Sequence, residues 1–308
     1  MNNPVISIII PCYNVSEYIE ASIESCYLQN YENLEVIAID NNSTDDTWNK
    51  LKNMAQNHSG LIITREKRKG APAARNKGLS IAKGDWIQFL DADDLLLPNK
   101  IGHQINIINN KASFIAAASI KRDINDNETT RLPNKQNVFL SLFKTSLGNT
   151  CSNLWNKKYL DKVNGWNEAL KSSQEADLMF RLLKINENIL YDNNPLTVIR
   201  ERNNGQISQT DVTGNLERYL QVRTEIIDYI KHNKKEYYLK NETDLLNLLF
   251  NLLRKVYKHN PELATDIYMK YFPEKFTPQI SNVTTNLYIK TFKIFGFRYT
   301  EKLRRIIK

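Results

Sequence analysis

Four short apolar segments alternate with helical segments near the start of the chain, and this alternation constrains the fold more than any other feature. The apolar segments are residues 5–10, 34–39, 60–64 and 86–90. The first is a β-branched run and the last is too short for a buried helix, so the segments predict strands. Residues 16–28 and 47–56 between them have helical spacing of apolar residues. The pattern predicts an α/β fold with a mostly parallel central sheet flanked by helices.

Polar residues follow three of these predicted strands. Ligands of such sheets lie beyond the carboxyl ends of the strands, which brings together residues 11–14, 40–43 and 91–94. The first turn, Pro-Cys-Tyr-Asn, has no glycine, so the Gly-rich turn of a dinucleotide-binding enzyme is missing, as is a Walker lysine loop. A metal ion could instead neutralise a bound diphosphate.

Three aspartates follow the fourth predicted strand within four positions: Asp91, Asp93 and Asp94. On an extended chain Asp91 and Asp93 point the same way, with the small Ala92 between them. Two carboxylates on one face suit Mn²⁺ or Mg²⁺, which keep open positions for phosphate oxygens. Alternatively, the aspartates begin a turn and cap a helix that starts near Leu95.

The net charge of +8 is unevenly distributed along the 308 residues. Residues 1–212 carry 24 Lys and Arg against 24 Asp and Glu, whereas residues 213–308 carry 18 against 10. A neutral body with a basic tail argues against a nucleic-acid-binding protein. The three cysteines form no close pair, and neither a secretory signal nor a membrane-spanning run is apparent. We therefore expect a cytoplasmic protein.

Four motifs resemble, in order and spacing, those of family 2 inverting glycosyltransferases with the GT-A fold. They are Val-Ile-Ser-Ile-Ile-Ile-Pro-Cys-Tyr-Asn at 5–14, Asp-Asn-Asn-Ser-Thr-Asp at 40–45, Ala-Arg-Asn-Lys-Gly at 74–78 and Phe-Leu-Asp-Ala-Asp-Asp at 89–94. The resemblance implies a GT-A domain at 1–212. Its first half, 1–110, would bind a nucleotide diphosphate sugar, and its second half, 111–212, the acceptor. A basic, helical region would follow at 213–308.

The resemblance also implies roles for individual residues. Tyr13 would stack on the nucleotide base, with Pro11 shaping that pocket, and the neighbouring Asn14 would also bind the nucleotide sugar. Asp40 and Asn41 would contact the base or the ribose. The family commonly has an aspartate where Asn41 stands, and an amide can donate as well as accept. In the family this aspartate often accepts the imide proton of uracil, and the Asn41 oxygen can still accept it. Uridine therefore stays the favoured nucleotide, with thymidine and guanosine left open.

Further residues are implied to handle the diphosphate. Arg75 would contact the base or the diphosphate. Asp93 would be the main ligand of Mn²⁺ or Mg²⁺, and Asp91 would bind the metal or the ribose. Ala92, between them, would also belong to the nucleotide-sugar site. Residues 199–208 resemble a late family segment that closes over the diphosphate, in which Arg202 would supply positive charge to the leaving group.

Residues 172–183 resemble the segment that carries the family's general base. Inverting transfer requires a base to take the proton of the acceptor hydroxyl. By position this base is Glu175, with Gln174 in place of the usual first acid and Asp177 as the competing candidate. Alternatively, these side chains only favour the N-terminus of a helix electrostatically.

The last predicted helix carries an aromatic and aliphatic stripe flanked by basic residues: Tyr288, Phe292, Phe295, Tyr299, Leu303 and Ile306. This pattern suits a helix at 287–308 on an anionic membrane surface. Alternatively, the helix packs on the protein with a solvated basic face.

The resemblance as a whole implies a metal-dependent transferase. It would move a sugar, with inversion, to a glycan or lipid-linked acceptor in surface polysaccharide synthesis, and it could be peripheral on the inner face of the membrane. Two alternatives are a nucleotidyltransferase and an inactive relative that acts as a membrane or assembly scaffold. The departures at Asn41 and Glu175 would support the scaffold.

Overall fold

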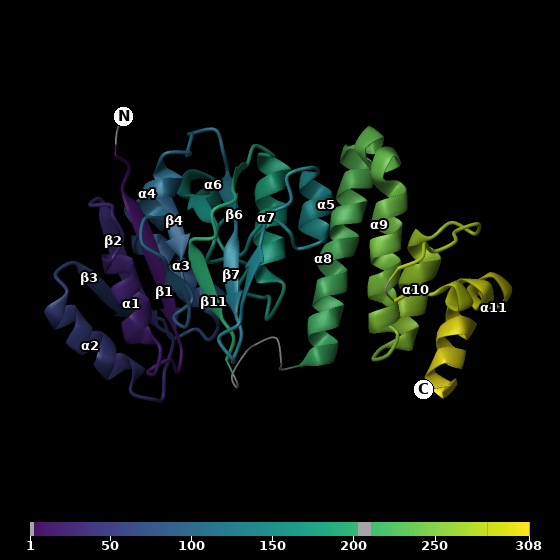
Figure 1. The fold of residues 1–308 in the computed structure, drawn as a ribbon, viewed down its shortest axis with the longest axis horizontal. Coiled ribbons are helices and arrows are strands. Elements are labelled where there is room, and N and C mark those ends of the chain that lie inside the picture. Colours follow the sequence, from purple (N-terminus) through teal and green to yellow (C-terminus); the bar gives the residue numbers. More distant parts are fainter. Residues whose placement is uncertain (1–2, 203–210, 282, 308) are drawn as a thin grey trace. The chain divides into compact units, whose positions relative to one another are not determined.

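A computed structural model describes most of the chain, namely residues 3–202, 211–281 and 283–307 (Figure 1). The chain forms two compact units, residues 1–205 and 206–308. The first is α/β and the second is helical. The predicted α/β body with a C-terminal helical extension is thus confirmed, whereas the boundary after residue 212 stays a prediction.

A seven-stranded sheet forms the centre of the first unit. In spatial order its strands are β10 (Leu190–Asp192), β6 (Phe114–Ala117), β9 (Leu154–Asn156), β4 (Trp86–Phe89), β1 (Ile6–Cys12), β2 (Leu34–Asp40) and β3 (Leu61–Arg65). Only β9 runs antiparallel to its neighbours, β4 and β6, among these described strands. The prediction of a mostly parallel sheet is therefore confirmed.

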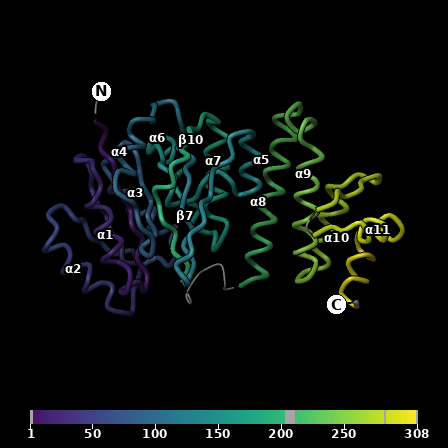
Figure 2. Tube along the Cα trace, viewed as in Figure 1, coloured from purple at the N-terminus to yellow at the C-terminus, as the bar shows by residue number. Residues whose placement is uncertain are grey.

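Helices cover both faces of this sheet because side chains alternate along β1 and β2. The helices of the unit, which Figure 2 traces in order, are α1 (Ile19–Tyr27), α2 (Thr47–Asn57), α3 (Ala71–Ile81), α4 (Lys100–Ile105), α5 (Val138–Phe143), α6 (Lys157–Lys162) and α7 (Gln174–Ile185). Ile8 and Val36 share one buried cluster with residues of α1 and α2. On the opposite face, a Cβ at Gly78 of α3 would lie 2.8 Å from Ile39 Cδ1. Gly78 therefore lets α3 pack closely on the sheet.

Strand β1 runs two residues beyond its predicted end at residue 10, through Pro11 to Cys12. Beyond Ile9 it pairs with β2 alone, since β4 pairs only with Ile6–Ile9. Proline has no backbone N–H group to donate, so Pro11 is accommodated here because β1 has a neighbouring strand on one side only.

A smaller sheet adjoins the acidic segment. In spatial order it contains β5 (Leu95–Leu96), β11 (Thr197–Arg200), β7 (Ser119–Arg122) and β8 (Glu128–Arg131). Leu95 and Leu96 pair antiparallel with β11, and the next helix begins only at Lys100. The alternative that the aspartates cap a helix near Leu95 is therefore wrong, because pairing with a distant strand draws these leucines into a sheet.

The second unit is built of four described helices around its own core. They are α8 (Val212–Asn233), α9 (Lys235–Val256), α10 (Pro261–Tyr271) and α11 (Asn286–Ile307). Phe250 of α9 packs against aromatic rings of α10 and α11. Gly296 has a φ of 68° and bends α11 into two helical halves. None of the helices in the described ranges is long and apolar enough to span a bilayer.

Candidate active site

The loops that follow β1, β2 and β4 lie at the same edge of the sheet, as predicted. The three strands are adjacent and parallel. The backbone N–H of Asn41 donates to the Cys12 carbonyl over 2.7 Å. The backbone N–H of Asn14 donates to Ser43 Oγ over 3.1 Å. The first two loops are thus joined by hydrogen bonds.

Tyr13 and Asn14 occupy the exposed tip of the first loop. The Tyr13 side chain is 58% exposed, so its ring is accessible to a ligand. Asn14 has a φ of 50°, and its side-chain oxygen accepts from the backbone N–H of Thr44 over 2.8 Å. Pro11 precedes them at the end of β1 and is partly buried. Stacking of a base on Tyr13 stays a prediction.

Asp40 and Asn41 are both buried at the end of β2. The Asn41 amide donates to the carbonyls of Glu66 and Arg68 over 2.9 and 2.7 Å. Its oxygen accepts from the backbone N–H of Gly70 over 2.8 Å. Both amide N–H groups are thus engaged, and one lone pair of the oxygen is left for a base or ribose. That contact stays a prediction.

The acidic segment is a turn rather than an extended strand. Strand β4 ends at Phe89, and the Asp94 N–H donates to the Asp91 carbonyl over 2.9 Å. The extended chain expected at Asp91 and Asp93 is therefore wrong, because a turn and not strand alternation sets the side-chain directions. The turn, in which Ala92 is buried, brings Asp91 close to Asp94.

Within the described residues, one group of side chains could share a metal ion. The ligand atoms of Asp91, Asp94 and Cys151 lie within 4.8 Å of one another. Burial and then the charges of Asp93 and Asp91 raise the pKa of Asp94, and burial also raises the pKa of Cys151. A cation would relieve this repulsion. Carboxylates suit Mn²⁺ or Mg²⁺ and a thiol does not, so the fit rests on the aspartates.

Asp93, the predicted main metal ligand, is paired with Arg202. Arg202 Nε lies 2.5 Å from Asp93 Oδ2, and Arg200 Nε donates to the Asp93 carbonyl. Burial and the neighbouring Asp91 raise the pKa of Asp93, while Arg202 opposes that rise. The role of Asp93 toward a metal stays a prediction. The rest of the segment predicted to close over the diphosphate, residues 203–208, lies outside the described residues.

Arg75 of α3 is buried and connects the acidic turn to α7. Its Nη2 donates to Asp91 Oδ1 over 2.6 Å, and its Nη1 donates to Gln174 Oε1 over 3.3 Å. Its guanidinium lies 4.6 Å from the ring centre of Trp166. This bridging role is not apparent in the sequence, and the predicted contact with a base or diphosphate stays a prediction.

Glu175 lies in the first turn of α7. Its Oε2 accepts from the backbone N–H and from the hydroxyl of Thr150, the latter over 2.7 Å. Burial raises the pKa of Glu175, while the Thr150 hydrogen bonds and the charge of Arg75 oppose that rise. A carboxylate with a raised pKa accepts a proton more readily than an ordinary one.

Asp177, the competing candidate base, is engaged in the packing of α7. Arg181 Nε and Nη2 donate to Asp177 Oδ2 over 2.9 and 2.7 Å. The same guanidinium donates to the carbonyls of Val163 and Gly165, over 2.7 Å each. Arg181, oriented by Asp177, therefore holds α7 on the turn at Gly165, and because Asp177 is engaged in this way Glu175 is the better candidate base.

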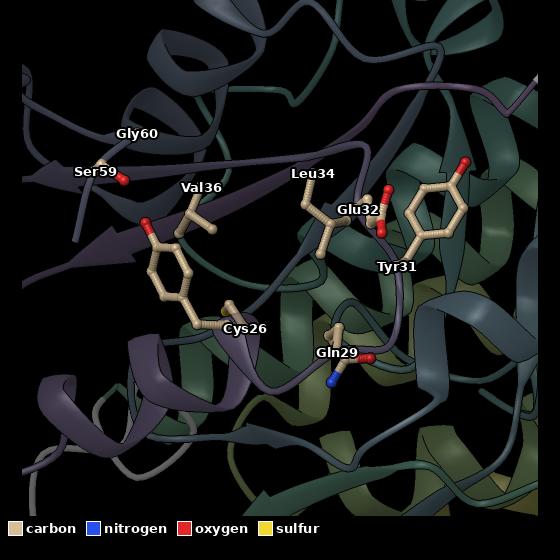
Figure 3. Close-up of a pocket in the computed structure, with 9 residues that line it drawn as sticks. Cys26, Gln29, Tyr31, Glu32, Leu34, Val36, Ser59 and Gly60 are labelled. Atoms are coloured by element: carbon tan, nitrogen blue, oxygen red, sulfur yellow. The ribbon is translucent and has the colours of Figure 1, made fainter.

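A cavity of about 240 Å³ lies at the opposite edge of the sheet, where β2 and β3 begin. Leu34 and Val36 of β2 line it together with Cys26 of α1 and Gly60 before β3 (Figure 3). Its position away from the acidic turn separates it from the candidate active site.

The fold is that of the GT-A class of nucleotide-sugar transferases. The model of Glycosyl transferase family 2 matches residues 7–165, more than half of the chain. The chain therefore belongs to this family.

Curated relatives match parts of the chain. An uncharacterized glycosyltransferase of Rickettsia felis is 34% identical over 194 residues, which cover 59% of this chain and 32% of the relative. The chain thus spans about a third of that relative. A UDP-Glc:alpha-D-GlcNAc-diphosphoundecaprenol beta-1,3-glucosyltransferase of Escherichia coli is 41% identical over 112 residues, covering 36% of this chain and 44% of the relative.

Solved structures share the fold over nearly the whole chain. Staphylococcus aureus TarS in complex with UDP-GlcNAc has a TM-score of 0.61 at 17% identity and covers 99% of this chain and 92% of that one. The mannosyltransferase PcManGT of Pyrobaculum calidifontis, in complex with GDP-Man and Mn²⁺, has a TM-score of 0.56 at 15% identity and covers 99% and 88%. At such identities the likeness concerns the fold.

Proposed function

We propose that the protein is an inverting, metal-dependent glycosyltransferase. It transfers a sugar from a nucleotide diphosphate, with a UDP-sugar favoured, to a glycan or lipid-linked acceptor in surface polysaccharide synthesis. The observation that carries this proposal is the path from Asp91 through Arg75 to Gln174, which ends one residue before Glu175. A fixed link of this kind keeps the donor-side acids and the acceptor-side base at a constant separation.

The relatives support the choice of donor and acceptor. The Escherichia coli relative is named for transfer from UDP-Glc to a diphosphoundecaprenol-linked GlcNAc. A second one, 40% identical over 116 residues, is named for the same reaction. A lipid-linked acceptor would place the enzyme at the inner face of a membrane.

In this mechanism each side chain has one task. Asp91, Asp93 and Asp94 would hold Mn²⁺ or Mg²⁺, which would stabilise the charge of the departing diphosphate. Glu175 takes the proton of the acceptor hydroxyl as its oxygen attacks the anomeric carbon opposite the diphosphate, so the configuration inverts. Tyr13 stacks on the base and fixes the donor.

The test uses purified protein, a series of nucleotide sugars and Mn²⁺. Wild-type protein should slowly release nucleoside diphosphate, and Asp93→Ala should lose the Mn²⁺-dependent part of the thermal shift produced by UDP. Glu175→Gln should keep that thermal shift but lose transfer. The matched variant Glu128→Gln, at a surface ion pair, should keep both.

Three outcomes would contradict the proposal. Transfer at the wild-type rate by Glu175→Gln would mean that another group is the base. Release of pyrophosphate would identify a nucleotidyltransferase. Release of neither product from any donor would favour the scaffold.

A further inference from the structure

The bent helix α11 has one side that belongs to the core of the second unit. Tyr288, Phe292 and Phe297 are only 7, 5 and 3% exposed. Their ring centres lie 6.0, 5.5 and 5.6 Å from that of Phe250. The prediction of a single aromatic stripe along the helix is therefore wrong, because the bend at Gly296 divides it between the core and the surface.

The other side of α11 exposes apolar side chains in both halves. Before the bend, Leu287 and Ile294 are each 74% exposed. After the bend, Tyr299 and Ile306 are 62 and 73% exposed. The members of each pair are seven residues apart, a spacing that puts them on the same side of a helix. Phe295, half-exposed, lies next to the bend.

The charged side chains around these apolar residues are basic. In the described part of α11 the exposed ones are Lys290, Lys293, Arg298, Lys302 and Arg305, whereas Arg304 is half-buried and lies 3.5 Å from Glu301. The acid of the helix, Glu301, is 2% exposed, and its carboxylate lies 2.6 Å from Arg254 Nε inside the unit. The outer side of α11 thus presents apolar and cationic side chains without an acid.

We propose that this outer side of α11 docks on an anionic phospholipid membrane. Lysine and arginine would reach lipid phosphates while Leu287, Ile294 and Ile306 enter the boundary with the acyl chains. A second copy joined through the same surface would set cations against cations. A nucleic acid would match the cations but leave the apolar side chains in water. A lipid surface satisfies both features.

The test is flotation of the full chain with vesicles of phosphatidylcholine, with or without phosphatidylglycerol. The protein should float only with the anionic vesicles, and added salt should weaken binding. Lys293→Gln with Lys302→Gln should weaken binding about thirtyfold, since each basic residue near the surface contributes on the order of 1 kcal/mol. Ile294→Ser with Ile306→Ser should also release the protein.

The matched control lies on α9, where Leu239 is 61% exposed and Lys240 is also exposed. Leu239→Ser with Lys240→Gln should leave vesicle binding unchanged. The replaced side chains of α11 are exposed, so thermal melting should not change either. Equal flotation with neutral vesicles, or full binding by both α11 variants, would overturn the proposal. The proposal would also be overturned if the wild-type protein formed a dimer, or a complex with duplex DNA, and the α11 variants abolished that association but still bound vesicles. None of these outcomes depends on sugar transfer.

Discussion

At the scale of single residues, Asp93 is paired with an arginine where a metal ion is expected. The side chains of Arg202 and Asp93 are 19 and 15% exposed, so water screens their attraction only in part. The guanidinium also lies 5.4 Å from the ring centre of Tyr18, which helps to hold it there. A metal ion that takes Asp93 Oδ2 would displace Arg202, which would free this cation for the leaving diphosphate.

Arg202→Gln should therefore have opposite effects on two ligands. Without the competing cation, the protein alone should bind Mn²⁺ more tightly. A gain of about 1.4 kcal/mol in binding free energy would make the affinity tenfold higher. UDP with saturating Mn²⁺ should bind more weakly, because a positive charge near the diphosphate is lost. Titration calorimetry measures both. Arg122→Gln, which breaks the surface pair with Glu128, is the control. An unchanged Mn²⁺ affinity in Arg202→Gln would contradict the exchange.

Lys100 gives the free energy of unfolding a pH dependence. It is buried, and its Nζ has no hydrogen-bond partner among the described residues. Burial lowers its pKa from 10.5 to about 7, against the opposing charges of Asp192 and the nearby cysteines. Between these values the unfolded chain binds a proton that the native protein lacks, so stability should rise with pH.

Lys100→Met should flatten this rise, because methionine binds no proton in either state. Urea unfolding at several pH values between about 7 and 10 measures the slope. The exposed Lys52→Met is the control and should keep the wild-type slope. If the unfolding free energy of Lys100→Met rises with pH as steeply as that of the wild type, other groups set the pH dependence.

The sequence predicts which residues form the candidate site better than it predicts their geometry. Local patterns place the aspartates after a strand, but β5 turns them because it pairs with β11 about a hundred residues later. Arg75 likewise meets Gln174, a partner ninety-nine residues away. Such contacts depend on tertiary packing, which a single sequence without known pairings does not specify.

At the scale of elements, strands and helices with regular apolar spacing are predictable, whereas bends are not. The spacing along α11 indicates a straight helix, yet Gly296 adopts a φ of 68°. Glycine tolerates this conformation at low cost. The bend is stabilised because it lets Phe297 pack into the aromatic core around Phe250. The packing of the core in the second unit, and not the local sequence pattern, therefore determines that α11 bends.

A buried ion pair holds the second half of α11 to α9. The side chains of Arg254 and Glu301 are 4 and 2% exposed, and Arg254 also donates to Thr284 Oγ1 over 2.7 Å. Glu301→Gln leaves a buried arginine without its charge partner and should cost about 3–5 kcal/mol of unfolding free energy. Urea unfolding measures it. Lys270→Gln, at a surface pair with Asp228, should cost less than about 1 kcal/mol. A similarly small loss in Glu301→Gln would mean that the pair contributes little.

At the scale of the whole molecule, charge and structure divide at a similar point along the chain. Residues 1–212 have equal numbers of acidic and basic side chains, and the excess of positive charge lies in 213–308. The structure separates units at 205 and 206. Sugar transfer and membrane docking therefore rest on different units, and either one can fail without the other.

Because each unit has its own core, each should unfold in its own transition during scanning calorimetry. UDP with Mn²⁺ should raise the transition temperature of the first unit only. At a hundredfold excess over the dissociation constant, the ligand should add about 2.7 kcal/mol to that unit's free energy of unfolding. Glu301→Gln should lower only the other transition, since its partner Arg254 lies in the second unit. If ligand and substitution instead shift one common transition, the two units unfold together. A substitution in α11 would then also lower the stability of the unit that carries the candidate active site.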